Sequence, residues 1–130
     1  MGLSVSPGGE PDRMPPPPRE DSRPDDVFGI RVEEKGSTLI MHLSGEFDWA
    51  CIGRVEAALE RASDARFKEV VLDLRKLEFL DSAGLRTILR ANDRARVERF
   101  DLVVVRPRGL ANRVFTLTRA SKQLMLVDGA

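Results

Sequence analysis

The sequence has little of the chemistry that disulfides and metal sites require. Among its 130 residues it has one cysteine, Cys51, and one histidine, His42. A lone cysteine forms no internal disulfide, which favours a reducing compartment, and we expect a cytoplasmic protein. A metal or catalytic role for His42 would need further imidazoles or thiols beside it. We therefore predict no cofactor and no metal, with His42 as an ordinary strand histidine and Cys51 as a small packed residue.

A surplus of charge is also lacking. The 21 Lys and Arg residues balance the 21 Asp and Glu residues. Nucleic acid binding needs an excess of positive charge on one face, and a polybasic membrane anchor needs the same. No apolar run approaches the length that spans a bilayer, and the polar start, residues 1–10, does not resemble a signal peptide. We expect neither nucleic acid nor membrane as a partner.

The composition that remains is that of a soluble domain with a tail. Hydrophobic residues make up 42% of the chain and charged residues 32%. Residues 1–26 combine a proline run, Pro15 to Pro18, with charges and little to bury, which predicts a disordered Pro-rich N-terminal tail. The run favours polyproline geometry; it is either a docking motif or, as we prefer, a spacer. Residues 27–130 form the predicted domain.

The domain opens with a predicted β-hairpin. Apolar and polar residues alternate over residues 28–33, as in a strand with one buried face. Residues 34–37 are typical of a turn, with Gly36 able to take positive φ. Residues 38–44 form a second strand that places Leu39, Met41 and Leu43 on one face. The two strands therefore predict an antiparallel hairpin.

Helices and strands alternate after the hairpin. Apolar stripes at helical spacing and short β-branched runs mark the elements. The predicted order is a helix from Ile52 to about Phe67, a strand 69–74, a helix 82–99, a strand 101–106, a helix with the stripe Leu110, Val114 and Leu117, and a last strand or docked segment 124–127. This order predicts an α/β fold whose mixed sheet of four to five strands starts with an antiparallel hairpin and packs against three or more helices.

The most informative stretch follows the strand 69–74. An apolar link, residues 77–80, is expected to pack beneath the surface, and Asp81 and Ser82 then arrive where a helix begins. Serine is among the best N-cap residues, and an aspartate there complements the helix dipole. Gly84 would leave the first turn bare, so that another surface could approach the backbone. Local physics alone explains Asp81 and Ser82 as a capping pair.

A phosphorylated Ser82 would act differently from a cap. The phosphate would lie at a helix N-terminus, where free backbone amides and the dipole favour a dianion, so the helix should survive. A small neutral hydroxyl would become a bulky charge beside Asp81. A partner packed on this surface would be repelled, which gives a switch without refolding.

The run 70–85, with Asp-Ser-x-Gly-Leu after a strand and an apolar link, resembles the STAS domain of bacterial anti-sigma factor antagonists. Residues 45–48, Gly-Glu-Phe-Asp, resemble that family's Gly-Glu-Leu-Asp stretch after the second strand, at a similar distance from Asp81. The likeness covers about residues 30–127. It departs from the family at residues 49–53, where a proline is common, and at residues 118–123, where a Thr-Gly-Leu turn is common.

The resemblance implies a STAS fold and a non-enzymatic function. An unphosphorylated antagonist binds an anti-sigma factor that is also a serine kinase, and the sigma factor is released. The kinase phosphorylates the antagonist, here at Ser82, and the complex falls apart; a serine phosphatase restores the hydroxyl. The resemblance places the partner-binding residues at Asp48, Trp49, Asp81, Ser82, Ala83, Gly84 and Leu85.

Two other functions stay open. The chain could be a STAS adaptor in a stress-signalling or transporter complex without phosphorylation control, with Ser82 only a cap. It could also bind or hydrolyse a nucleotide weakly, although it has no glycine-rich phosphate loop with a lysine. For Trp49, two interpretations remain: an interface anchor or a core residue.

Overall fold

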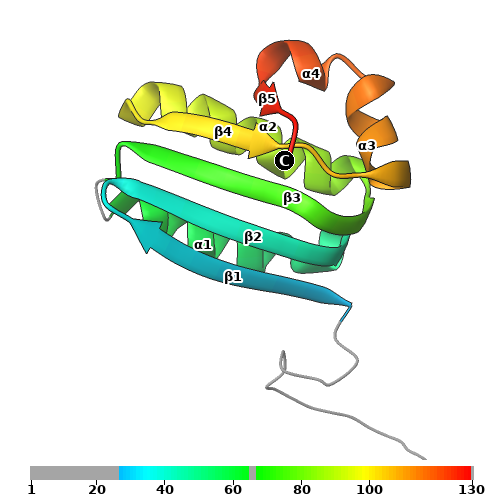
Figure 1. Cartoon of the computed structure of the whole chain (residues 1–130), viewed down its shortest axis with the longest axis horizontal. Coiled ribbons are helices and arrows are strands. Elements are labelled where there is room, and N and C mark those ends of the chain that lie inside the picture. The colour runs from blue at the N-terminus through cyan, green and yellow to red at the C-terminus, as the bar shows by residue number, and fades with distance from the viewer. Residues whose placement is uncertain (1–26, 65–66, 130) are drawn as a thin grey trace, which may run out of the picture.

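The computed structural model describes residues 27–64 and 67–129. A five-stranded sheet in the order β1-β2-β3-β4-β5 forms its centre (Figure 1). The elements are β1 (Phe28–Lys35), β2 (Thr38–Phe47), the 3₁₀ helix η2 (Trp49–Cys51), α1 (Ile52–Asp64), β3 (Glu69–Leu80), α2 (Ser82–Glu98), β4 (Asp101–Val105), α3 (Gly109–Thr116), α4 (Ala120–Gln123) and β5 (Met125–Val127). The predicted tail, residues 1–26, lies outside the described residues.

The sheet is mixed, as the sequence predicts. Strands β1 and β2 are antiparallel, whereas the β2–β3, β3–β4 and β4–β5 pairs are parallel. Gly36 takes a positive φ of 60° in the turn between β1 and β2, which confirms its predicted role. The hairpin, the alternation of strands and helices and the α/β class are therefore confirmed, with five strands and four α-helices in the described part of the chain.

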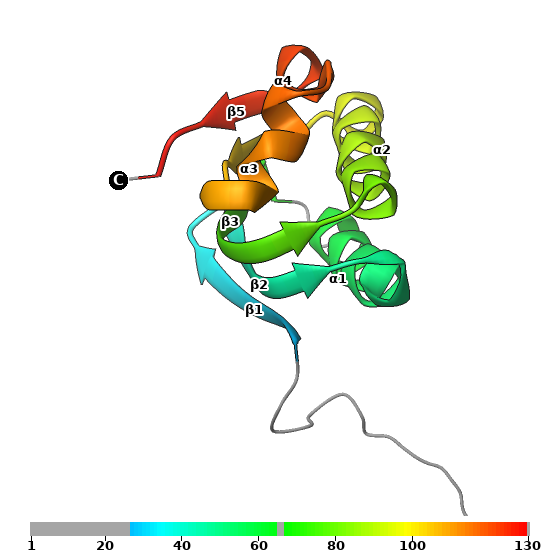
Figure 2. The ribbon, with the colours of Figure 1, turned by 90° about the vertical axis from the view of Figure 1, so that its right-hand side faces the viewer.

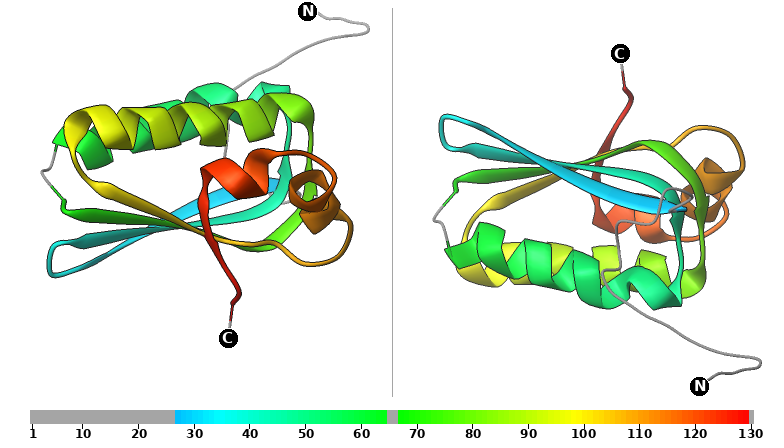
Figure 3. Two further views of the ribbon diagram at one scale, coloured as in Figure 1. Left: turned by 90° about the horizontal axis from the view of Figure 1, so that it is seen from above. Right: turned by 90° about the horizontal axis from the view of Figure 1, so that it is seen from below.

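One face of the sheet is covered by α1 and α2, which lie side by side (Figures 2 and 3). The core lies between this face and the two helices. Strand residues such as Met41, Leu72 and Val104, which are neighbours across β2, β3 and β4, are fully buried there. From the helices, Val55 and Ile88 fill the same layer. We call the opposite side, which α1 and α2 do not cover, the open face.

Strand β3 is longer than the sequence indicates. The predicted link 77–80 is the second half of this strand and pairs with the end of β2. Leu77 and Leu80 are buried, but Glu78 and Phe79 are exposed, so the link does not lie wholly beneath the surface. The register between β2 and β3 shifts twice, after His42 and after Gly45, but pairing continues as far as Phe47 and Leu80.

The predicted apolar stripe of the third helix is wrong at two of its three positions, since only Val114 packs against the core. The helix α3 packs against β3 through Ala111 and Phe115, which are buried. Leu110 and Leu117, two residues of the predicted stripe, are each 74% exposed. Helical spacing alone is consistent with burial of either set of residues. The large Phe115 side chain takes the core position because it buries more apolar surface.

For residues 124–127 the sequence predicts either a last strand or a docked segment, and the structure shows a strand. Residues 125–127 form a strand, β5, which pairs with β4 in parallel after the short helix α4. The helix α4 contacts α2, and the Asn92 side chain donates a 2.9 Å hydrogen bond to the Gln123 carbonyl. No helix within the described ranges is long and apolar enough to cross a membrane.

Candidate functional site

The N-terminus of α2 lies beside the end of β2, and Asp81 joins the two. The Asp81 backbone N–H donates to the Phe47 carbonyl at 3.3 Å. Its carboxylate accepts a 2.8 Å hydrogen bond from the Gly84 backbone N–H through Oδ1 and a 3.2 Å bond from the Trp49 backbone N–H through Oδ2. One carboxylate therefore both caps α2 and holds the loop that follows β2.

Asp81, and not Ser82, is the N-cap of α2. Asp81 has extended backbone angles, φ −95° and ψ 179°, and its side chain reaches the third helical residue. Ser82 is the first residue inside the helix and is exposed. Its hydroxyl makes no hydrogen bond to another described residue. The expectation that Ser82 serves as a cap is therefore wrong, since Asp81 already satisfies the free amide that a capping serine would take.

The loop that Asp81 holds presents a tryptophan. Asp48 begins η2 and accepts a 3.0 Å hydrogen bond from the Ala50 N–H, which fixes the turn after β2. Trp49, the next residue, is 74% exposed. This exposure excludes the interpretation of Trp49 as a core residue and leaves its interpretation as an interface anchor. Cys51 is buried as predicted, and burial raises the pKa of its thiol.

Gly84 faces inward rather than toward solvent. A Cβ on Gly84 would lie 2.7 Å from Leu80 Cδ1 and 3.0 Å from the Phe47 carbonyl oxygen. The glycine therefore lets α2 approach the strand ends closely, and it does not leave a bare turn for a partner as the sequence suggests. Leu85 is also buried. Of the predicted partner-binding residues, Trp49 and Ser82 are exposed, Asp48, Asp81 and Ala83 are half-buried, and Gly84 and Leu85 belong to the core.

Sequence reasoning missed one exposed aromatic residue at this end of the sheet. Phe79 is 47% exposed and pairs in register with Glu46, one position before the Phe47 and Leu80 pair. Its position was assigned to a buried link, although alternation along a continued strand would have turned either Phe79 or Leu80 outward. No group of three or more His, Cys, Asp or Glu residues suited to a metal occurs in the parts of the chain that the structure describes.

The family follows from comparison with known proteins. A family model described as "Mlab, STAS domain" matches residues 30–128. This chain belongs to the STAS domain family. The match agrees with the family resemblance and with the STAS fold expected from the sequence.

Individual relatives of this STAS chain are regulators. Over 61 residues it is 39% identical to the anti-sigma F factor antagonist of Paenibacillus polymyxa; the match covers 46% of this chain and 52% of that protein, so the chain spans about half of that relative's length. A crystal structure of an anti-sigma factor antagonist from Mycobacterium paratuberculosis superimposes with a TM-score of 0.72 at 28% identity, over 83% of this chain and 91% of that one. Both relatives are described as anti-sigma factor antagonists, the kind of protein that the sequence resembles.

The fold is shared more widely. The unphosphorylated anti-sigma factor antagonist SpoIIAA has a TM-score of 0.68 at 17% identity, over 78% of this chain and 89% of its own. The phosphorylated form of SpoIIAA, from Bacillus, has a TM-score of 0.63 at the same identity. At this identity the likeness concerns the arrangement of sheet and helices alone.

Proposed function

We propose that this STAS domain is an anti-sigma factor antagonist that binds an anti-sigma factor serine kinase and is switched off by phosphorylation of Ser82. The observation that carries the proposal is that Asp81 caps α2, which leaves the Ser82 hydroxyl exposed beside an exposed Trp49. Ser82 is therefore available for modification without loss of a structural bond. The similarity to anti-sigma factor antagonists supplies the partner class.

The unphosphorylated surface suits a protein partner. Trp49 and Phe79 are large exposed apolar side chains at the end of the sheet where α2 begins. Tryptophan is enriched among residues that carry binding energy, and a partner docked on this end would bury Trp49. Asp48 and Asp81 orient this surface through backbone hydrogen bonds, while Gly84 and Leu85 hold α2 against the strand ends from within.

A phosphate on Ser82 would change this surface by charge and by volume. It would lie at the first turn of α2, where the free backbone amides and the helix dipole favour a dianion. It would also lie next to the Asp81 carboxylate, and like charges this close repel. The hydrogen bond from the Trp49 backbone to Asp81 is exposed and would weaken. The displaced tryptophan and the added negative charge would both lower the affinity for the partner. A serine phosphatase would reverse the change.

The fold tolerates such a modification in a related case. SpoIIAA has been solved in unphosphorylated and phosphorylated forms, and this chain superimposes on both with TM-scores of 0.68 and 0.63. A switch that leaves the fold in place is therefore compatible with this architecture. In the proposal, the cytoplasm supplies the kinase, the phosphatase and the ATP.

The test is phosphorylation in vitro. The protein is incubated with ATP and each candidate anti-sigma kinase from the same genome, and its intact mass is measured. We expect one added phosphate on the wild type and on Ser37→Ala, a control that removes an exposed serine from the β1–β2 turn, and none on Ser82→Ala. A phosphate on Ser82→Ala, or none on the wild type with every kinase, would contradict the proposal and favour the adaptor function.

A further inference from the structure

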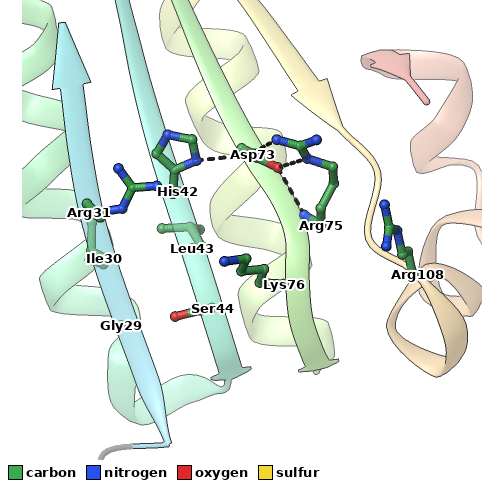
Figure 4. A pocket seen from close by; sticks show the side chains of 10 residues that line it. All are labelled: Gly29, Ile30, Arg31, His42, Leu43, Ser44, Asp73, Arg75, Lys76 and Arg108. Atoms are coloured by element: carbon green, nitrogen blue, oxygen red, sulfur yellow. Dashed lines mark hydrogen bonds and ion pairs between the residues drawn. The ribbon is translucent and has the colours of Figure 1, made fainter. Parts of the chain in front are cut away.

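A groove with several charged side chains lies on the open face of the sheet (Figure 4). Its cavity measures about 480 Å³. The side chains that matter come from β1 (Arg31), β2 (His42 and Ser44), β3 (Arg75 and Lys76) and the loop before α3 (Arg108). A hollow of this volume accommodates a small molecule.

An ordered ion network forms the floor of the groove. The buried Asp73 carboxylate accepts hydrogen bonds from Arg75 Nε at 2.9 Å and Nη2 at 2.8 Å, and its Oδ2 lies 2.8 Å from His42 Nδ1. The other ring nitrogen of His42 lies 3.0 Å from a Glu33 oxygen. Arg75 follows Asp73 by two positions on β3, the spacing at which strand side chains share a face. The network therefore holds the Arg75 guanidinium in one orientation, with its charge neutralised by Asp73.

Three further cations line the cavity without such neutralisation. Arg31, Lys76 and Arg108 have no ion pair within the described ranges. Asp73, which lines this cavity, is already engaged by Arg75 and His42. The groove thus gathers positive charge from three separate elements of a chain whose formal net charge is zero. Converging cations of this kind raise the local positive potential and attract an anion into the groove.

We propose that this groove is a binding site for a small molecule that carries two or more anionic groups, phosphate or carboxylate. Arg31, Lys76 and Arg108 supply the charge, and the Ser44 hydroxyl is placed to add a hydrogen bond. Among the residues that the structure describes, no aromatic side chain lines the cavity, so recognition rests on charge and not on stacking with a base. The groove is walled by strands and a loop, which suits a small anion better than a flat protein partner. The proposal does not depend on Ser82.

The experiment is a titration of the ¹⁵N-labelled full chain followed by amide chemical shifts. Sodium pyrophosphate and, separately, sodium citrate are added to about 10 mM at constant ionic strength, which keeps nonspecific screening fixed. We expect saturable shifts confined to amides around Gly29, Ser44 and Lys76, with a Kd of about 1 mM or tighter. Saturation by pyrophosphate alone supports a phosphate ligand, and saturation by citrate alone supports a carboxylate ligand. Saturation by both supports an anion site that does not distinguish phosphate from carboxylate.

Variants decide whether the groove is responsible. Lys76→Ala/Arg108→Ala and, independently, Arg31→Ala should weaken binding about tenfold, because each removes charge from the cavity. Arg90→Ala, which removes an exposed cation from α2 on the covered side of the sheet, should bind as the wild type does. These residues are exposed, so folded spectra are expected for all variants. Shifts that do not saturate, or equal affinity in the groove variants and Arg90→Ala, would overturn the proposal.

Discussion

The Trp49 backbone N–H donates a hydrogen bond to the Asp81 side chain, 3.2 Å from Oδ2, while Oδ1 of the same carboxylate caps α2. The two residues are 32 positions apart in the chain. A cap that also holds the neighbouring loop couples the conformation of α2's first turn to the position of an exposed tryptophan.

Removal of the cap should destabilise the protein more than removal of the switch hydroxyl. Asp81→Ala loses both backbone hydrogen bonds of the carboxylate and is expected to lower the free energy of unfolding by about 1–2 kcal/mol. Ser82→Ala removes an exposed hydroxyl without a described partner, so its effect should stay within about 0.5 kcal/mol. Urea unfolding of both variants measures the difference. A larger loss in Ser82→Ala than in Asp81→Ala would restore Ser82 as the cap.

Gly84→Ala should destabilise α2 although alanine is the better helix former. Its Cβ would lie 2.7 Å from Leu80 Cδ1 and 3.0 Å from the Phe47 carbonyl oxygen, and overpacking of this kind costs about 1–3 kcal/mol. Gly53→Ala in α1 is the matched control, since a Cβ there meets nothing within 4 Å. The control should gain about 0.5–1 kcal/mol from helix propensity. Thermal unfolding should therefore move in opposite directions for the two variants, and equal shifts would refute the packing argument.

Trp49→Ala should weaken binding of the anti-sigma kinase with little effect on folding. The side chain is 74% exposed, so its truncation removes few contacts in the free protein, whereas a buried tryptophan in an interface contributes about 2 kcal/mol or more. Val97→Ala, at an 80% exposed position near the other end of α2, is the control. Calorimetric titration with the kinase should show a Kd raised at least about thirtyfold for Trp49→Ala and unchanged for Val97→Ala. Unchanged binding in both would place the interface elsewhere.

The Asp73 network should make stability depend on acid. Hydrogen bonds from the Arg75 side chain, aided by His42, hold the pKa of Asp73 far below its usual range against the opposing effect of burial. A carboxyl whose pKa is lowered by folding stabilises the protein above its unfolded-state pKa of about 3.9, and this stabilisation is lost as pH falls toward the folded-state value. Asp73→Asn should therefore cost about 1–3 kcal/mol at neutral pH.

The difference between the wild type and Asp73→Asn is the quantity to follow with pH. It should be constant above about pH 5 and shrink steadily below about pH 4, because the wild type alone then loses the charged Asp73. Urea unfolding at several pH values measures it. Glu60→Gln, at an exposed acidic residue on α1, controls for the general effect of charge. A difference that does not change with pH would show that the shape of Asp73, and not its charge, matters.

Local patterns in the sequence were sufficient to predict most of the helices and strands of the fold. Alternation over residues 28–33 and 38–44 fixed the hairpin, and the stripe of Val55, Leu59 and Ala62 fixed the buried side of α1. These elements bury one face against a large core, so periodicity and burial agree. The Asp-Ser-x-Gly-Leu motif located the candidate site because its order along the chain reproduces that of a known family.

Tertiary contacts decided the rest. The Trp49 backbone N–H donates to one oxygen of Asp81, 32 positions away in the chain. Phe47 and Leu80 pack tightly around Gly84. These contacts make Asp81 the cap and leave Ser82 exposed. On α3, the choice between Phe115 and Leu110 for the core depends on the shape of β3 beneath it. Spacing along a chain determines which side chains share a face. Which face is buried, and which polar atoms remain free, depends on the neighbours that the folded sheet supplies.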